Sequence, residues 1–216
     1  MIEALSLDAA GTLFDLAEPV GTTYARIARK HGFLLEPETT EQRFRNAFTQ
    51  TPPPNYSKYP SGHFAEADWW RQIVLQVTQT QESPQFTQFF AELFTHYEST
   101  EAWQLFPETI EFLTAAQSRF RLIVLSNFDL RLHPILANLT LTPFFETVIS
   151  SADACARKPD PLIFELAVQR LKLTPSAILH IGDSRSADFE GALKNGLLAR
   201  HLDRSKDSLL SLLKSL

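Results

Sequence analysis

The sequence predicts an α/β fold whose core is a doubly wound, Rossmann-like parallel sheet. Three short apolar runs rich in Leu, Ile and Val have the composition of buried parallel strands, and they cover residues 4–7, 122–125 and 178–181. Two weaker runs, at residues 147–151 and 198–202, are expected to add strands. Residues at helical spacing fill the intervals between the later runs, and strands that alternate with helices indicate a parallel sheet.

A small polar or acidic cluster follows each of the three strong runs. These clusters are residues 8–12, 126–129 and 182–184. Ligands of parallel α/β sheets bind in the crevice beyond the carboxyl ends of the strands. We therefore expect the functional site at this edge of the sheet.

Residues 15–104 interrupt the alternation of strands and helices. They contain apolar residues at helical spacing and no convincing strand. The Phe-rich stretch 86–97 has this spacing too, and it is expected to form the core of a helical domain. The chain is thus predicted to fold as an α/β core domain, residues 1–14 and 105–216, with an all-helical domain inserted after the first strand.

The composition limits the classes of partner. Of the 216 residues, 44% are hydrophobic and 21% are charged, and the formal net charge is −5. This charge disfavours non-specific binding to nucleic acid or to an anionic membrane. No apolar run approaches the roughly 18 residues that a membrane span needs, and no basic segment of a signal peptide is visible. We expect a cytoplasmic protein without nucleic-acid or membrane partners.

The single cysteine and the histidines offer no catalytic or zinc motif. Cys155 cannot form an intrachain disulfide, which fits a reducing compartment, and it is expected to be a small packing residue. His133, His180 and His201 are too scattered to suggest a zinc site, and His180 is expected to pack beside the sheet.

Three carboxylates are expected to meet at the strand ends. Asp8 follows the first run, and Asp183 and Asp188 follow the third. Carboxylates brought together repel one another and take up protons unless a cation neutralises them. Mg²⁺, which prefers oxygen ligands, would do so, and Lys158 is a further candidate to offset the charge.

Four segments, taken in order, resemble the motifs of the haloacid dehalogenase-like (HAD) hydrolases. Residues 8–14 (Asp-Ala-Ala-Gly-Thr-Leu-Phe) resemble the first motif and residues 125–127 (Leu-Ser-Asn) the second. Residues 157–161 (Arg-Lys-Pro-Asp-Pro) resemble the third, and residues 181–188 (Ile-Gly-Asp-Ser-Arg-Ser-Ala-Asp) the fourth. The helical insertion resembles the cap domain of this family. Further segments resemble one branch of it: residues 20–25, 54–56, 69–70 and 125–129.

The resemblance implies a role for each matching residue. Asp8 would attack phosphorus and form an aspartyl-phosphate, which divides one difficult step into two. Asp8, the backbone carbonyl of Ala10 and Asp183 would be the protein ligands of Mg²⁺, with Asp188 in a supporting position. The substrate would be a small phosphorylated molecule, and the protein would be a monomer or a homodimer.

The same resemblance assigns substrate-binding residues around Asp8. Ser126 and Lys158 would hold the transferring phosphoryl oxygens, and Lys158 would also balance the charge of Asp8. Asn127 would contribute its backbone N–H, and Thr12 would order the loop after Asp8. Catalysis would then consist mainly of positioning and charge stabilisation.

One position departs from the family pattern. Most family phosphatases carry an acid two residues after the nucleophile, where this chain has Ala10. General acid–base assistance contributes about 10²–10⁴ in rate. A phosphohydrolase without it would be slow, would favour good leaving groups such as acyl phosphates, or would borrow an acid from the cap, for which Asp15, Tyr56, His63 and Asp68 are candidates.

Two other functions stay open. The first is a carbon-centred hydrolase. Phosphonatases of the family also have Ala at this position and use a cap lysine, for which Lys30 and Lys58 are the candidates in the insertion. Haloacid dehalogenases match residues 8–14, but they work without Mg²⁺ and lack an acid at the position of Asp183. The chain could also be a catalytically weak protein that binds phosphoryl groups in a regulatory role.

Overall fold

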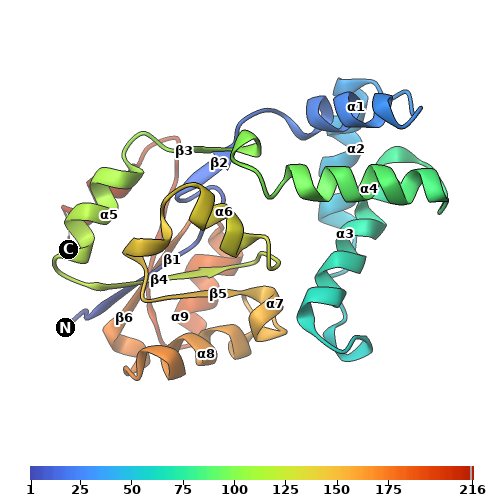
Figure 1. Cartoon of the computed structure of the whole chain (residues 1–216). Coiled ribbons are helices and arrows are strands. Elements are labelled where there is room, and N and C mark those ends of the chain that lie inside the picture. Colours follow the sequence, from blue (N-terminus) through green and yellow to red (C-terminus); the bar gives the residue numbers. More distant parts are fainter. Residues whose placement is uncertain (215) are drawn as a thin grey trace. The chain divides into compact units, whose positions relative to one another are not determined.

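The structure is a computed structural model, and it describes residues 1–214 and 216. Its contacts divide the chain into two compact units (Figure 1). The core unit comprises Met1–Asp15 and Leu105–Leu216, and the insert unit comprises Leu16–Gln104. The first and last residues of the chain therefore both belong to the core unit.

A five-stranded parallel sheet forms the centre of the core unit, in the order β5-β4-β1-β6-β7 (Figure 1). From one edge to the other its strands are β5 (Thr147–Ser150), β4 (Arg121–Ser126), β1 (Ala4–Leu7), β6 (Ile178–Gly182) and β7 (Leu198–His201). The chain adds β4 and β5 on one side of β1 and then β6 and β7 on the other, so the strand order reverses beside β1. All five predicted strands are present, and the predicted α/β parallel-sheet fold is confirmed.

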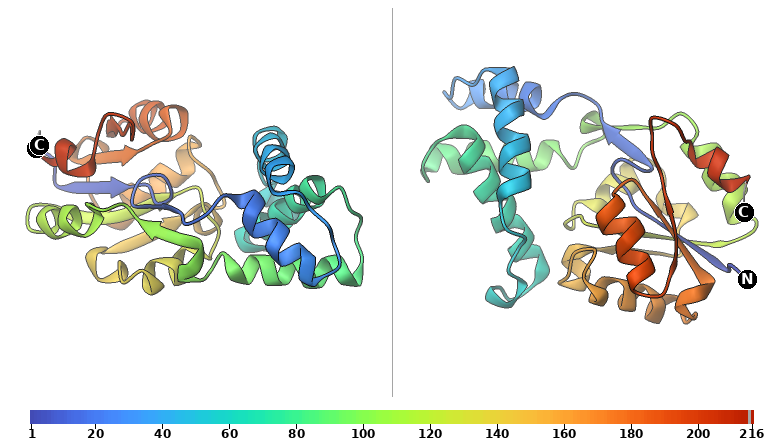
Figure 2. Two further views of the ribbon diagram at one scale, coloured as in Figure 1. Left: turned by 90° about the horizontal axis from the view of Figure 1, so that it is seen from above. Right: turned by 180° about the vertical axis from the view of Figure 1, so that it is seen from behind.

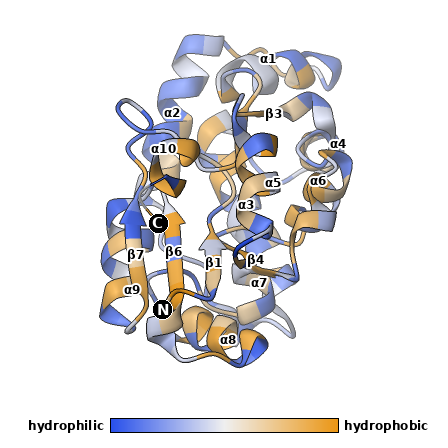
Figure 3. Ribbon diagram, turned by 90° about the vertical axis from the view of Figure 1, so that its left-hand side faces the viewer, coloured by the Kyte–Doolittle hydropathy of each residue, from blue (hydrophilic) through white to orange (hydrophobic). Residues whose placement is uncertain are grey.

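The central strands are buried because helices cover the sheet. Every residue of β1 and β6 is buried, and Figure 3 shows β6 as strongly hydrophobic. Helix α8 (Pro161–Leu171) begins at the N-cap Asp160, whose side chain accepts a hydrogen bond from the backbone N–H of Leu162. Its buried face packs in one apolar cluster with β4, β5 and β6, through Ile163, Phe164, Ala167 and Leu171. The other α-helices described in this unit are α5 (Thr109–Gln117), α6 (Leu132–Asn138), α7 (Ser151–Ala154), α9 (Gly191–Lys194) and α10 (Leu209–Leu213), with a π-helical segment, η5 (Arg185–Glu190), before α9.

The insert unit contains four α-helices and two short 3₁₀ turns, the second of which is η2 (Thr100–Ala102); Figure 2 shows the unit from two further sides. The helices are α1 (Val20–Lys30), α2 (Pro37–Gln50), α3 (Gly62–Thr78) and α4 (Pro84–His96), and the first turn is η1 (Tyr56–Lys58). Phe86, Phe89 and Leu93 of α4 pack in this unit's own apolar core, as the Phe-rich pattern predicts. Helices α1 and α2 approach closely at Gly21, where a Cβ atom would lie 2.1 Å from the carbonyl oxygen of Pro37.

Two short strands that the sequence does not predict lie at the ends of the insertion. They are β2 (Phe14–Leu16) and β3 (Trp103–Leu105), which pair to form a separate two-stranded sheet. The expectation of no strand in residues 15–104 is wrong at its two ends. Strands of three residues are too short to show the alternation that identifies a strand in sequence.

Cys155 is exposed at the left-handed C-cap of α7, with φ of 49°, so the prediction that it is a small packing residue is wrong. None of the helices in the described residues is both long and apolar enough to cross a membrane.

Candidate active site

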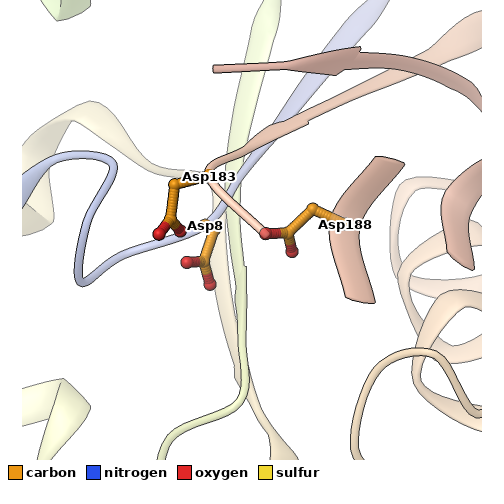
Figure 4. A group of neighbouring side chains, drawn as sticks. All are labelled: Asp8, Asp183 and Asp188. Atoms are coloured by element: carbon orange, nitrogen blue, oxygen red, sulfur yellow. The ribbon is translucent and has the colours of Figure 1, made fainter. Parts of the chain in front are cut away.

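Three carboxylates meet at the carboxyl ends of β1 and β6, as Figure 4 shows. Asp8 directly follows β1, and its backbone N–H donates to the carbonyl oxygen of Ile181, 2.9 Å away, on β6. Asp183 directly follows β6, and Asp188 lies on η5. One oxygen from each carboxylate lies within 4.8 Å of the others. The predicted juxtaposition of these three residues is present in the structure.

The ammonium group of Lys158 lies among these carboxylates. Its Nζ atom is 2.8 Å from Oδ1 of Asp8, 2.5 Å from Oδ1 of Asp188 and 2.7 Å from the carbonyl oxygen of Leu125. An ammonium has three donors, so each is assigned to one of these acceptors. The side chain is 1% exposed, and water therefore does not compete for these bonds.

The charges shift the pKa of each group. Burial lowers the pKa of Lys158, but the carboxylates of Asp8 and Asp188 outweigh burial and raise it. Burial raises the pKa of Asp8, although Lys158 opposes this rise. For Asp188, the Lys158 and His180 side chains outweigh burial, and the pKa is lowered. Lys158 is thus held as a cation, and Asp188 as an anion.

Asp183 differs from the other two carboxylates because one side of it is open to solvent. Packing on its other side, followed by the negative charges of Asp8 and Asp188, raises its pKa to about 6. A cation bound beside it would remove the cause of much of this shift.

Two glycines make room for these carboxylates. Gly11 has φ of +78°, and a Cβ atom there would lie 2.6 Å from Oδ2 of Asp183. A Cβ atom at Gly182 would lie 2.3 Å from Oδ2 of Asp188. Any side chain at either position would displace a carboxylate of the cluster, so both positions need glycine.

Ser126 and Asn127 act on Asp8 and on Lys158. The Ser126 hydroxyl hydrogen-bonds the Asp8 carboxylate, which favours its ionised form. The Asn127 side chain accepts from the backbone N–H of Lys158 at 2.6 Å and donates to the carbonyl oxygen of the same residue at 2.9 Å. Asn127 therefore fixes the backbone at Lys158, a contact that the sequence does not predict.

The loop after Asp8 is tightly turned. The backbone N–H groups of Thr12 and Leu13 both donate to the carbonyl oxygen of Ala9, at 3.1 and 2.7 Å. The Thr12 side chain is fully buried, and its hydroxyl has no hydrogen-bond partner among the described residues. Ala10 is half-buried in this loop, with a methyl group at the position of the usual second acid.

Arg204 supports this loop from the segment after β7. Its guanidinium donates to the carbonyl oxygens of Gly11 and Thr12 and to the carboxylate of Glu108. The same group lies over the Phe106 ring, 3.6 Å from the ring centroid. No motif indicates Arg204 in the sequence, because its partners are distant in the chain and two of them are backbone atoms.

A cavity of about 330 Å³ opens beside Asp183 in the core unit. Asp15 contributes to its wall, and the other wall residues are Gly11, Phe106, Asp183, His201, Leu202, Asp203, Arg204 and Ser205. Of the four candidate acids proposed from the sequence, Asp15 lines this cavity together with Asp183.

Three of the other candidates, Tyr56, Asp68 and Lys30, have polar partners inside the insert unit. The Tyr56 hydroxyl donates to Glu66 at 2.6 Å, and Asp68 accepts from Tyr59 at 2.7 Å. Lys30 is ion-paired with Glu92 at 2.5 Å. His63 and Lys58 are exposed, and the His63 ring lies 5.8 Å from that of Phe64.

Comparison with known proteins identifies the family. A family model described as haloacid dehalogenase-like hydrolase matches residues 2–196. The chain belongs to the haloacid dehalogenase-like hydrolase family. Haloacid dehalogenase-like hydrolase domain-containing protein 3 of Mus musculus is 35% identical over 199 residues, which cover 89% of this chain and 78% of the mouse protein. The Homo sapiens protein of the same name is 32% identical, over 91% of this chain and 80% of that protein. These are relatives from the branch that the sequence resembles.

Solved structures of this family share the fold of the hydrolase. A HAD phosphatase from Thermococcus onnurineus has a TM-score of 0.69 at 23% identity, with 99% of this chain and 97% of that one covered. L-2-haloacid dehalogenase from Xanthobacter autotrophicus has a TM-score of 0.72 at 22% identity, with 99% and 82% covered. Both likenesses concern the fold.

The donor set of the hydrolase fits a divalent metal ion. Its three carboxylates provide oxygen ligands within reach of one another, and Lys158 offsets only one of the three negative charges. Hard cations such as Mg²⁺ prefer such ligands. The raised pKa of Asp183 is a further sign that negative charge here is incompletely neutralised.

Proposed function

We propose that this HAD-like hydrolase is a Mg²⁺-dependent phosphohydrolase that acts on a small phosphorylated molecule. The observation that carries the proposal is the Lys158 ammonium, fixed 2.8 Å from Asp8 within a group of three carboxylates. A lysine in this position holds the nucleophile and adds positive charge where the phosphoryl oxygens would lie.

The reaction would proceed in two displacements at phosphorus. In the first, a carboxylate oxygen of Asp8 bonds to phosphorus as the bond to the leaving oxygen breaks, which produces an aspartyl-phosphate. In the second, water attacks phosphorus, and phosphate leaves while the Asp8 carboxylate is restored. Ser126 and Lys158 orient Asp8 throughout.

The metal ion would be held by Asp8, Asp183 and the backbone carbonyl of Ala10, with Asp188 in support. Its positive charge would stabilise the developing charge on the phosphoryl oxygens. A supporting place for Asp188 agrees with its contacts, since both of its oxygens accept hydrogen bonds from the protein.

The substrate class follows from Ala10. Without an acid two residues after Asp8, a leaving oxygen of high basicity departs slowly because no proton is delivered to it. An acyl phosphate needs no such proton, since its leaving group is a carboxylate. We therefore propose acyl phosphates as preferred substrates, and Asp15 as the residue that assists when an ester is hydrolysed.

A phosphate-release assay with Mg²⁺ tests this function. Acetyl phosphate is compared with a panel of alkyl phosphate esters, for the wild type, Asp8→Asn and Glu165→Gln, which neutralises an exposed carboxylate on α8 as a control. We expect faster turnover of acetyl phosphate, loss of activity in Asp8→Asn and full activity in Glu165→Gln. Failure to release phosphate from any substrate, or activity that survives Asp8→Asn, contradicts the proposal.

A carbon-centred hydrolase is the second candidate, because it needs no acid at Ala10. The two chemistries place the oxygen of water differently. Water that attacks phosphorus leaves its oxygen in the released phosphate, whereas water that attacks the carboxyl carbon of an Asp8 ester leaves it in Asp8. A single turnover in ¹⁸O-labelled water, followed by peptide mass spectrometry, therefore separates them.

A phosphorylated Asp8 that forms but is never hydrolysed would instead indicate a phosphoryl-binding regulatory protein.

A further inference from the structure

The His180 ring is fully buried in the sheet and joins β1 to the acidic cluster. Its Nδ1 atom lies 2.9 Å from the Oγ of Ser6, the residue opposite His180 in the register of β1 and β6. Its Nε2 atom lies 3.0 Å from Oδ1 of Asp188. The ring of Phe164 meets it at an interplanar angle of 87°. Both ring nitrogens thus have a polar partner, and the ring plane is held by packing.

The direction of the bond to Asp188 follows from the chemistry of its acceptor. An ionised carboxylate only accepts hydrogen bonds, and the pKa of Asp188 is lowered. Nε2 therefore carries a proton and donates it to Oδ1. Ser6 then completes the hydrogen bonding of the ring, as a buried polar group requires.

Asp188 is held from three directions. Oδ1 accepts from His180 and from the Nζ atom of Lys158, at 3.0 and 2.5 Å, while Oδ2 accepts from the backbone N–H of Ser184 at 2.9 Å. The shared oxygen, Oδ1 of Asp188, is one of the three acceptors that hold the Lys158 ammonium in place. A continuous line of hydrogen bonds therefore runs from Ser6 to the nucleophile, through His180, Asp188 and Lys158.

We propose that His180 is a positioning residue, which fixes Asp188 so that the Lys158 ammonium stays against Asp8. This inference rests on the proposed phosphohydrolase function for its kinetic test, but the geometry it requires can be measured without turnover. The proposed role of His180 is to orient the Lys158 ammonium in the transition state. Loss of His180 should therefore lower kcat and leave KM unchanged.

Two variants of similar polarity separate positioning from simple packing. The amide nitrogen of Gln can occupy the place of Nε2, so His180→Gln keeps a donor to Asp188. The shorter Asn reaches only the place of Nδ1, so His180→Asn keeps a partner for Ser6 and loses the donor. Loss of an outer residue that orients a group of the reaction centre through a hydrogen bond typically costs about 10–100-fold in activity.

With acetyl phosphate and Mg²⁺, we expect His180→Asn to lower kcat by about 10–100-fold at unchanged KM. His180→Gln should stay within about threefold of the wild type, since it keeps the donor to Asp188. Equal losses in kcat for the two variants, or a change confined to KM, would overturn the proposal. If the wild type shows no turnover, the phosphohydrolase function is refuted. The inference about His180 is then tested by the magnetic resonance measurement described next, which needs no substrate.

Nuclear magnetic resonance of the ¹⁵N-histidine-labelled wild type tests the geometry directly, and it needs neither a variant that folds nor a substrate. We expect a protonated Nε2 at His180, with the slow proton exchange and downfield shift of a bond to a carboxylate. A His180 ring protonated only at Nδ1 would overturn the proposal.

Discussion

The Nζ atom of Lys158 lies 2.8 Å from Oδ1 of Asp8, although 150 residues separate the two in the chain. Asp8 directly follows the central strand β1, and Lys158 lies in the loop between α7 and α8. Asn127 fixes the backbone of Lys158, and the carbonyl oxygen of Leu125 accepts one of its protons. The carboxyl end of β4, where Leu125 and Asn127 lie, thus supports the contact between Asp8 after β1 and Lys158 before α8.

Lys158→Met should destabilise the metal-free protein, because it leaves Asp8 and Asp188 buried and without their cation. Removal of one partner from a buried ion pair costs about 3–5 kcal/mol. The free energy of unfolding in urea measures this loss. Lys194→Met, at an exposed position at the end of α9, should stay within about 0.5 kcal/mol of the wild type. Equal losses in the free energy of unfolding for the two substitutions would show that the charge of Lys158 does not stabilise the folded protein.

Ala10→Asp should restore the acid that the loop lacks. We expect the turnover of alkyl phosphate esters to rise by about 10²–10⁴-fold, with a smaller rise for acetyl phosphate, whose leaving group needs no proton. Ala10→Asn is the matched control, since it has the same shape and cannot titrate. An equal effect of Asp and Asn on ester turnover would contradict this prediction and indicate that Asp15 already supplies the proton in full.

Mg²⁺ should stabilise the folded protein in a pH-dependent manner. The pKa of Asp183 is raised from 3.8 to about 6. In the pH range between these two values, the folded state therefore keeps a proton on Asp183 that the unfolded state has released. In the absence of metal, the contribution of Asp183 to stability therefore falls as the pH rises through this window. Mg²⁺ competes with the same proton, and its binding should strengthen as the pH rises through about 6.

Thermal unfolding with and without saturating Mg²⁺ measures this effect. A metal at 100 times its Kd adds about 2.7 kcal/mol. We expect a clear rise in Tm at about pH 7, a smaller rise at about pH 5, and little at either pH for Asp183→Asn. A rise in Tm that Asp183→Asn retains in full would place the metal elsewhere.

Arg204→Lys should loosen the loop after Asp8 although it keeps the positive charge. Lysine lacks the planar donors that bind two carbonyl oxygens and Glu108 at once, and it stacks less well on Phe106. We expect the free energy of unfolding to fall by about 1–3 kcal/mol and kcat to fall with it. Arg170→Lys, at an exposed position in the last turn of α8, is the control. Unchanged stability in Arg204→Lys would contradict this role.

The sheet could be predicted because buried parallel strands are short, continuous apolar runs. The run at residues 4–7 corresponds to β1 without any shift, and the runs at 122–125 and 178–181 lie inside β4 and β6. The acidic cluster could be predicted for the same reason, since parallel strand ends meet at one edge. Strands β2 and β3 could not, because three residues show no periodicity.

The partners of the cluster depend on folding contacts that no local pattern records. His180 has the sequence neighbourhood of an ordinary buried strand residue, and only the strand register brings it to Ser6 and Asp188. Arg204 binds backbone carbonyls, which every residue possesses. A polar residue inside an otherwise apolar strand, as His180 is, is the one signal that could have indicated a buried partner.

Covalent phosphorylation of Asp8 is the most direct test of the proposed chemistry. The wild type is mixed with acetyl phosphate and Mg²⁺, quenched in acid within one turnover and digested for mass spectrometry. We expect one phosphoryl group on the peptide that contains Asp8, and none in Asp8→Asn. An unmodified Asp8 peptide during active turnover, or a phosphoryl group on another residue, would contradict the account.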